Sequence, residues 1–177
     1  MGELLEMTVD SIRVHIPSGQ HVVILKESAA ERYLPIWIGV SEANAIALRV
    51  AGITPERPIT HDLFANFLSE AGCVVDKVVV TSLANEVYYA HIDVQVAGKT
   101  IELDSRPSDA IAIAVRVGAT ILVSSDVLEA AGGELEPGME GGAAGEPDEQ
   151  RFDKIKNWIN ELDLPDLGTG PTGPDAS

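Results

Sequence analysis

Residues 101–116 read Ile101-Glu102-Leu103-Asp104-Ser105-Arg106-Pro107-Ser108-Asp109-Ala110-Ile111-Ala112-Ile113-Ala114-Val115-Arg116, with a dense polar cluster between two apolar runs. Ile101 and Leu103 alternate with acidic residues, which predicts the end of a β-strand. Residues 110–117 are apolar enough to form a helix that is buried on most sides. The polar cluster is therefore predicted to be a corner where a strand turns into a helix.

The residues of this corner suit the start of a helix. Pro107 fits the first helical position, because its missing N–H would have no partner there. Ser108 and Asp109 would follow in the first turn, where free N–H groups and the helix dipole favour an anion. Ordinary capping explains these two residues equally well. Asp104 and Arg106 are harder to explain as caps, and an ion pair that fixes the corner is their main alternative role.

The rest of the chain predicts hairpins and consecutive helices. Such an order is typical of an α+β domain with a largely antiparallel mixed sheet and helices packed on it. We expect the first strand to carry a bulge near Asp10 and Ser11. Ser41 and Thr60 are the expected caps of two successive helices. The expected strands cover residues 4–16, 21–26, 33–39, 73–82, 86–96, 100–104 and 120–123, and the expected helices cover residues 42–51, 61–71, 107–117 and a short segment from 125.

The domain organisation changes near residue 131. Residues 1–131 are expected to form a single compact domain, and the Gly- and Pro-rich residues 132–148 a flexible acidic linker. Residues 149–164 predict an amphipathic tail helix, which could dock on its own domain or in a groove of a partner protein. Residues 165–177 are expected to be disordered.

The charge distribution limits the function classes. The net charge is −16; residues 125–177 hold 13 acidic and 3 basic residues, against 15 and 9 in residues 1–124. This balance argues against nucleic-acid binding by basic residues alone, although a divalent cation can bridge an acidic site and a phosphate. The single cysteine, Cys73, excludes an intramolecular disulfide, and no stretch is long and apolar enough to span a bilayer. We expect a cytoplasmic protein without a membrane partner.

Four motifs resemble one known family when they are taken in order. They are LPIWIG at residues 34–39, EANAIAL at 42–48, RPITHDL at 57–63 and DSRPSDAIA at 104–112. Together they resemble the bifunctional nuclease domain family, and the likeness covers roughly residues 3–131. The resemblance implies a compact α+β domain that associates with copies of itself, and an activity that degrades both RNA and DNA.

Cleavage of phosphodiester bonds requires a nucleophile, charge neutralisation at the phosphate and help for the leaving oxygen. One or two Mg²⁺ or Mn²⁺ ions held by carboxylates can supply this help. The candidate metal ligands are Asp104, Asp109, Asp62 and Glu42. The candidate catalytic residues are Asp104, Asp109, His61 and Arg106, with His61 as general base or ligand. The candidate substrate-binding residues are Arg106, which could clamp a phosphate, Ser108 and Arg57.

Structural roles compete with each of these assignments. Acids are favoured in any first helical turn, so Glu42, Asp62 and the neighbouring His61 fit that role as well. The other histidines, including His91, lie inside predicted strands and are interpreted as ordinary strand residues. Two hypotheses follow: a metal-dependent nuclease of broad substrate range, and a non-catalytic oligomeric module whose polar corner contacts a ligand or another subunit.

Overall fold

The computed structural model describes residues 2–15, 18–133 and 141–143. The expected tail helix at 149–164 and the expected disordered segment at 165–177 lie outside these residues. So do residues 134–140 and 144–148 of the expected linker, whereas residues 141–143 form a short strand. The elements are β1 (Leu4–His15), β2 (Gln20–Glu27), β3 (Tyr33–Ile38), α1 (Val40–Val50), α2 (Thr60–Glu70), β4 (Val74–Ala84), β5 (Val87–Val96), β6 (Lys99–Ser105), α3 (Pro107–Val117), β7 (Thr120–Ser124), α4 (Ser125–Ala131) and β8 (Gly141–Ala143).

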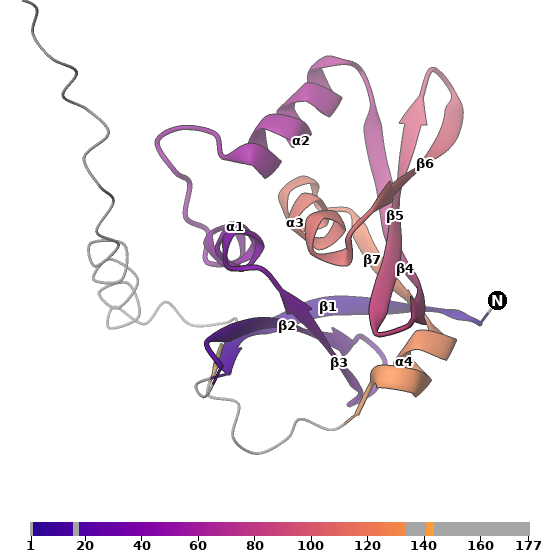
Figure 1. Cartoon of the computed structure of the whole chain (residues 1–177). Helices are drawn as coiled ribbons and strands as arrows, with labels where there is room; N and C mark the ends of the chain where they lie inside the picture. Colours follow the sequence, from indigo (N-terminus) through magenta and orange to yellow (C-terminus); the bar gives the residue numbers. More distant parts are fainter. Residues whose placement is uncertain (1, 16–17, 134–140, 144–177) are drawn as a thin grey trace, which may run out of the picture. The chain divides into compact units, whose positions relative to one another are not determined.

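The strands form one mixed sheet in the order β3-β2-β1-β7-β4-β5-β6, and β8 pairs with β1. All neighbouring strands are antiparallel except β4 and β7, which run parallel. Helices α1, α2 and α3 gather beside one another (Figure 1). The predicted α+β class with a largely antiparallel sheet is therefore confirmed. In β1 the register with β2 shifts between Val9 and Ser11, as the predicted bulge requires.

Two tight turns set the register of the β4–β5–β6 meander. Asn85 and Glu86 join β4 to β5, with φ angles of 50° and 64°. Ala97 and Gly98 join β5 to β6, with φ angles of 48° and 77°. Two central residues with positive φ are the mark of a type I′ turn, whose twist matches that of the two strands it connects. The second turn therefore fixes which side chains face one another on β5 and β6, whereas two register shifts in β4 also set its pairing with β5.

Helix α3 lies at the centre of the domain. Its residues Ala110 to Ala114 are all buried, and it packs on α1, α2 and several strands. Pro107 occupies the first helical position, as predicted, and Arg106 is the N-cap residue in an extended conformation. Gly118 ends the helix in the left-handed region, with a φ of 73°. The buried helix thus delivers its N-terminal turn to a fixed position.

The predicted caps of α1 and α2 are wrong. Helix α1 begins at Val40 with Gly39 as its N-cap, and α2 begins at Thr60 with Ile59 as its N-cap. In α2 the Asp62 carboxylate accepts a hydrogen bond of 3.0 Å from the Ile59 backbone N–H. The hydrogen bond at the start of α2 therefore comes from the Asp62 side chain in the first turn, and not from the predicted cap residue Thr60.

Among the described residues, no helix is long and apolar enough to cross a membrane.

Candidate functional site

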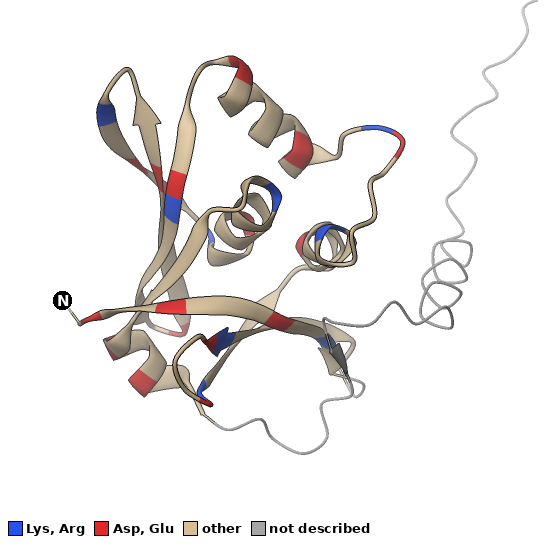
Figure 2. Ribbon diagram, turned by 180° about the vertical axis from the view of Figure 1, so that it is seen from behind, with Lys and Arg blue, Asp and Glu red and all other residues tan. Residues whose placement is uncertain are grey.

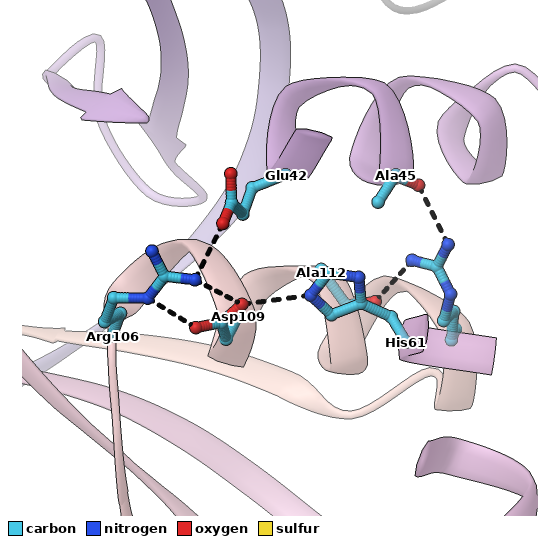
Figure 3. Close-up of polar contacts among 7 residues, drawn as sticks. Glu42, Ala45, His61, Arg106, Asp109 and Ala112 are labelled. Atoms are coloured by element: carbon cyan, nitrogen blue, oxygen red, sulfur yellow. Dashed lines mark hydrogen bonds and ion pairs between the residues drawn. The ribbon is translucent and has the colours of Figure 1, made fainter. Parts of the chain in front are cut away.

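The N-terminal turns of α1, α2 and α3 meet at one place, and each contributes a polar side chain to it (Figure 3). Glu42 comes from α1, His61 from α2 and Asp109 from α3, and Arg106 is the N-cap residue of α3. We call these four residues the Arg106 corner. The positive ends of three helix dipoles favour negative charge here, which accounts for the two carboxylates.

Arg106 connects the two carboxylates of the corner. Its Nε donates to Asp109 Oδ2 at 2.7 Å, and its Nη2 donates to Asp109 Oδ1 at 3.2 Å and to Glu42 Oε1 at 2.7 Å. The Arg106 side chain is nevertheless 67% exposed, while Glu42 and Asp109 are 16% and 31% exposed. The guanidinium is therefore held in place on its inner side and open to solvent on its outer side.

These contacts shift the pKa values of both partners. Burial by itself would raise the pKa of Asp109, but the hydrogen bonds from Arg106 and His61 outweigh it and hold that pKa below its ordinary value. The hydrogen bonds to Asp109 and Glu42 raise the pKa of Arg106 above its ordinary value. At neutral pH the corner therefore contains an ionised Asp109 and a permanently charged Arg106.

His61 is oriented by Asp109. Its Nε2 lies 3.0 Å from Asp109 Oδ1, and its side chain is 14% exposed. Because an ionised carboxylate can only accept, His61 Nε2 must carry the proton in this hydrogen bond. The lone pair of a neutral His61 is then on Nδ1, and that atom can take a proton from a bound molecule.

Gly39 leaves space for the corner. A Cβ atom at this position would collide with Glu42 Oε2. The carboxylate of Glu42 would therefore have to shift if residue 39 carried a side chain. This role was missed in the sequence, where Gly39 was taken as the end of a strand.

A second ion pair ties the three helices together behind the corner. Arg116 of α3 is only 5% exposed, and its Nε donates to Asp62 Oδ1 at 2.6 Å. Its Nη1 and Nη2 donate to the carbonyls of Ala112 and Ala45 at 2.8 and 3.0 Å. Burial would raise the pKa of Asp62, but the hydrogen bonds from Arg116 and the Ile59 N–H hold it below its ordinary value. Sequence reasoning missed Arg116, although a lone arginine in an apolar helix is a recognisable signal for a buried pair.

A pocket of about 340 Å³ adjoins this pair. Its lining includes Asp62 and Asn66 of α2, Arg49 of α1, Arg116 of α3 and Glu56 of the connection between α1 and α2. Arg49 is itself anchored, because it donates to the carbonyls of Val115 and Arg116 at the end of α3. The pocket thus combines polar groups from all three helices with apolar side chains such as Leu48 and Ile53.

The other predicted site residues lie away from the corner or are buried beside it. Asp104 is exposed on β6 directly across from His91 of β5. Its neighbour Leu103 packs on the hydrophobic core, so Asp104 projects from the opposite face of the sheet. Ser108 is 6% exposed in the first turn of α3, and Arg57 is exposed between α1 and α2. The structure therefore brings together Glu42, His61, Arg106 and Asp109, with Asp62 adjacent, but not Asp104 or Arg57.

The Arg106 corner does not fit a metal ion as it is arranged. Glu42 and Asp109 both accept hydrogen bonds from Arg106, and Asp62 accepts from Arg116. A guanidinium occupies the position between the two carboxylates where a cation would bind. Among the described residues one other group has suitable chemistry and spacing: His91, Asp93 and Glu102, whose ligand atoms lie within 4.8 Å of one another.

A signal for this second group was present in the sequence. A two-residue turn at Ala97 and Gly98 sets a register in which Asp93 of β5 pairs with Glu102 of β6, as the structure shows. The sequence analysis left His91 as an ordinary strand residue. A strand register must be known before residues on two strands can be assigned to one cluster, and a shift of one residue moves every side chain to the other face.

Comparisons with known proteins agree with the motifs of the corner. The profile of the family described as "Bifunctional nuclease domain" matches residues 23–136. Two proteins from strains of Mycobacterium tuberculosis, both named as uncharacterized, are each 37% identical over 162 residues, which is 92% of this chain and 97% of theirs. "Bifunctional nuclease 1" of Oryza sativa subsp. japonica is 27% identical over 117 residues, 64% of this chain and 35% of the rice protein.

The match to the family profile includes β3, all three helices that form the Arg106 corner, and the β4–β5–β6 meander. The predicted resemblance is therefore confirmed, and the chain belongs to the bifunctional nuclease domain family.

Proposed function

We propose that this protein is a nuclease that hydrolyses phosphodiester bonds in RNA and DNA, with its catalytic residues at the Arg106 corner. The family supports a nuclease in general terms, and the rice relatives are named bifunctional nucleases. The observation that carries the assignment is the contact of Asp109 with both His61 and Arg106. This contact supports the proposal that His61 is an oriented proton acceptor beside an exposed cation that suits a phosphate.

Arg106 would bind the phosphate. Its guanidinium is fixed by Asp109 and Glu42 on one side and exposed on the other, so it can donate to phosphate oxygens without first losing its orientation. The positive ends of the helix dipoles at the same place add to the attraction. As negative charge builds up on the phosphate oxygens in the transition state, these donors stabilise it.

His61 would act as the general base. The attacking oxygen, from a water molecule, transfers its proton to His61 Nδ1 while it forms a bond to phosphorus. The bond from phosphorus to the leaving oxygen breaks, and that oxygen takes a proton from solvent. Asp109 holds the ring through Nε2 and stabilises the imidazolium that forms. Asp109 is thus a positioning residue in this scheme.

The predicted Mg²⁺ or Mn²⁺ ion has no role in this scheme, because Arg106 and Arg116 already hold the carboxylates that would bind it. Catalysis is also not assigned to Asp104, which faces the other side of the sheet. Ser108 is proposed to fix the first turn of α3, since it is buried there. Arg57 is proposed to contact the substrate outside the corner, because it lies between Glu56 and Pro58, which line the adjoining pocket.

A second candidate is the non-catalytic oligomeric module. Two observations favour it: the charged groups of the corner are paired with one another, and α2 exposes large apolar side chains. Leu63 and Phe67 are 64% and 63% exposed, and they are one helical turn apart on α2. Such a surface suits self-association or a protein partner, and the corner would then be a structural clasp.

Cleavage of labelled single-stranded RNA and DNA by highly purified protein tests the nuclease assignment. We expect His61→Gln to lower the rate by about 100-fold or more, which is the usual range for a general base. Arg106→Gln should also lower the rate, mainly because it weakens binding of the transition state. Asp76→Asn is the matched control, because this exposed acid lies on β4 outside the corner.

Contaminating nucleases are separated from the protein's own activity by these variants, since a contaminant cleaves equally in every preparation. Reactions with Mg²⁺, Mn²⁺ or EDTA show whether a metal is needed. Equal rates for the wild type, His61→Gln and Asp76→Asn, with folding unchanged, would exclude catalysis at the corner and leave the oligomeric module as the function.

A further inference from the structure

We propose that His91, Asp93 and Glu102 form a binding site for one divalent transition-metal ion on the outer face of the β4–β5–β6 meander. Ile92 and Val94 of β5 belong to the hydrophobic core, so the alternating residues His91 and Asp93 face away from it. This face is opposite the one that carries the Arg106 corner. The proposal is therefore independent of the nuclease assignment.

The register of the meander places these side chains side by side. Asp93 of β5 pairs with Lys77 of β4 on one side and with Glu102 of β6 on the other. Residues that pair directly across antiparallel strands have their Cβ atoms within about 4.5–5.5 Å of one another. His91 is two residues from Asp93 on the same strand and therefore shares its face. Three potential ligands from two strands thus surround one point.

The distance between the His91 and Asp93 donor atoms fits a single ion. The ligand atoms of the three residues lie within 4.8 Å of one another, and His91 Nε2 is 3.2 Å from Asp93 Oδ1. Two donors that each lie about 2.0–2.1 Å from a tetrahedral ion are about 3.3 Å apart. Glu102 is exposed, so its side chain can adjust to complete the coordination.

Asp93 provides an independent sign of a missing partner. The residue is 7% exposed, and its Oδ1 is a buried acceptor with no hydrogen bond among the described residues. The contact with His91 Nε2 is close but lacks hydrogen-bond geometry. Buried carboxylate oxygens are rarely left without a donor or a cation. This oxygen lies 3.2 Å from His91 Nε2, the other candidate ligand on β5.

The balance of charge also calls for a cation. Asp93 and Glu102 pair directly, and Asp104 pairs with His91, so three carboxylates occupy neighbouring positions. Like charges directly opposite one another destabilise a sheet. Lys77 supplies one positive charge, with its Nζ 3.5 Å from Asp93 Oδ2, the oxygen that the ion would leave free. A dication would neutralise the remaining acids.

The donor set indicates the class of metal. One imidazole nitrogen with two carboxylates suits Zn²⁺, Mn²⁺ or Co²⁺, whereas Mg²⁺ and Ca²⁺ prefer oxygen ligands alone. Such an ion would join β5 to β6, which is the edge strand of the sheet (Figure 1). Because β6 leads directly into Arg106, binding would also fix the strand that carries the corner.

Equilibrium dialysis of the full-length, EDTA-treated protein against Zn²⁺, Mn²⁺ or Mg²⁺, followed by elemental analysis, tests the site. We expect one Zn²⁺ per chain with at least tenfold weaker binding in Glu102→Gln, whose exposed position leaves folding intact. Glu70→Gln is the matched control, because this exposed acid lies on α2, away from the meander. Lys77→Gln should bind about fivefold more tightly, since it removes a competing cation. Spectroscopy of the protein with bound Co²⁺ should detect a nitrogen ligand, and this ligand should be absent in His91→Gln.

Two results would overturn the proposal. One is the absence of stoichiometric Zn²⁺ binding at about 1 mM free ion. The other is equal affinity in Glu102→Gln and Glu70→Gln, which would mean that the ion binds elsewhere on this acidic chain.

Discussion

Replacement of Arg116 by methionine should destabilise the domain far more than the same change at Arg106. Both arginines belong to α3 or its cap and both bind carboxylates, but Arg116 is 5% exposed and Arg106 is 67% exposed. Figure 3 shows the Arg106 ion pairs, and also the carbonyls of Ala45 and Ala112, which accept from Arg116. Methionine keeps an apolar stem at either position, so the comparison isolates the guanidinium.

The size of the expected destabilisation follows from the polar groups that Arg116→Met leaves without a hydrogen-bond donor. Two carbonyls each lose a hydrogen bond worth about 1 kcal/mol, and Asp62 loses a partly buried cation worth about 1–2 kcal/mol. The expected loss is therefore about 3 kcal/mol in the free energy of unfolding. For a domain of this size that corresponds to a fall in Tm of about 10 °C. Arg106→Met breaks a solvent-screened pair and should cost about 1 kcal/mol or less.

Urea denaturation followed by far-UV circular dichroism measures both values. A double-mutant cycle with Asp62→Asn then isolates the coupling between Arg116 and Asp62, which we expect to be about 1–2 kcal/mol. The reasoning is refuted if Arg116→Met costs no more than Arg106→Met, or if the cycle gives no coupling. Either result would mean that the Arg116–Asp62 pair does not hold the three helices together.

Three further predictions concern other parts of the domain. The folded-state pKa values of Asp62 and Asp109 are below their ordinary value of 3.8. The stability that these two carboxylates contribute is therefore present above that pH and is lost as the pH falls through the folded-state pKa values. Urea titrations at pH 6 and pH 3 should show this loss of stability, and the loss should be smaller in Asp62→Asn. Gly118→Ala should cost about 1 kcal/mol because φ at this position is 73°, and an unchanged urea midpoint would contradict this. Phe67→Ser, which removes a side chain that is 63% exposed on α2, should weaken self-association in sedimentation velocity without loss of folding; an unchanged association constant would exclude this face as the contact.

The charge pattern shows why the acidic composition did not decide the function. Acidic and basic residues are interspersed over the described elements rather than collected into separate faces (Figure 2). The total charge of −16 therefore says little about the local field at Arg106, where one guanidinium, two carboxylates and the positive ends of helix dipoles meet. Bulk charge limits non-specific binding to nucleic acid, but it does not describe a site.

Local sequence patterns were sufficient for most elements of the fold. The bulge in β1, the position of Pro107 and the end of α1 and α2 near Gly52 and Gly72 depend on a few adjacent residues, and the structure agrees with each. The caps of α1 and α2 were mispredicted because Ser41 and Thr60 are preferred cap residues close to the observed caps, Gly39 and Ile59. In α2 the side chain of Asp62 satisfies the free N–H instead.

The sequence by itself determined that the chain is an α+β domain of a recognisable family, with a polar corner at the start of a buried helix. These features follow from periodicity, from proline and glycine positions and from contiguous motifs. Only the tertiary structure decided which charges meet: Arg106 holds Glu42 across 64 residues of chain, while Asp104, two residues from Arg106, faces the other side of the sheet. The physical reason is that helix packing and strand register set these distances, and both depend on contacts between residues far apart in the chain.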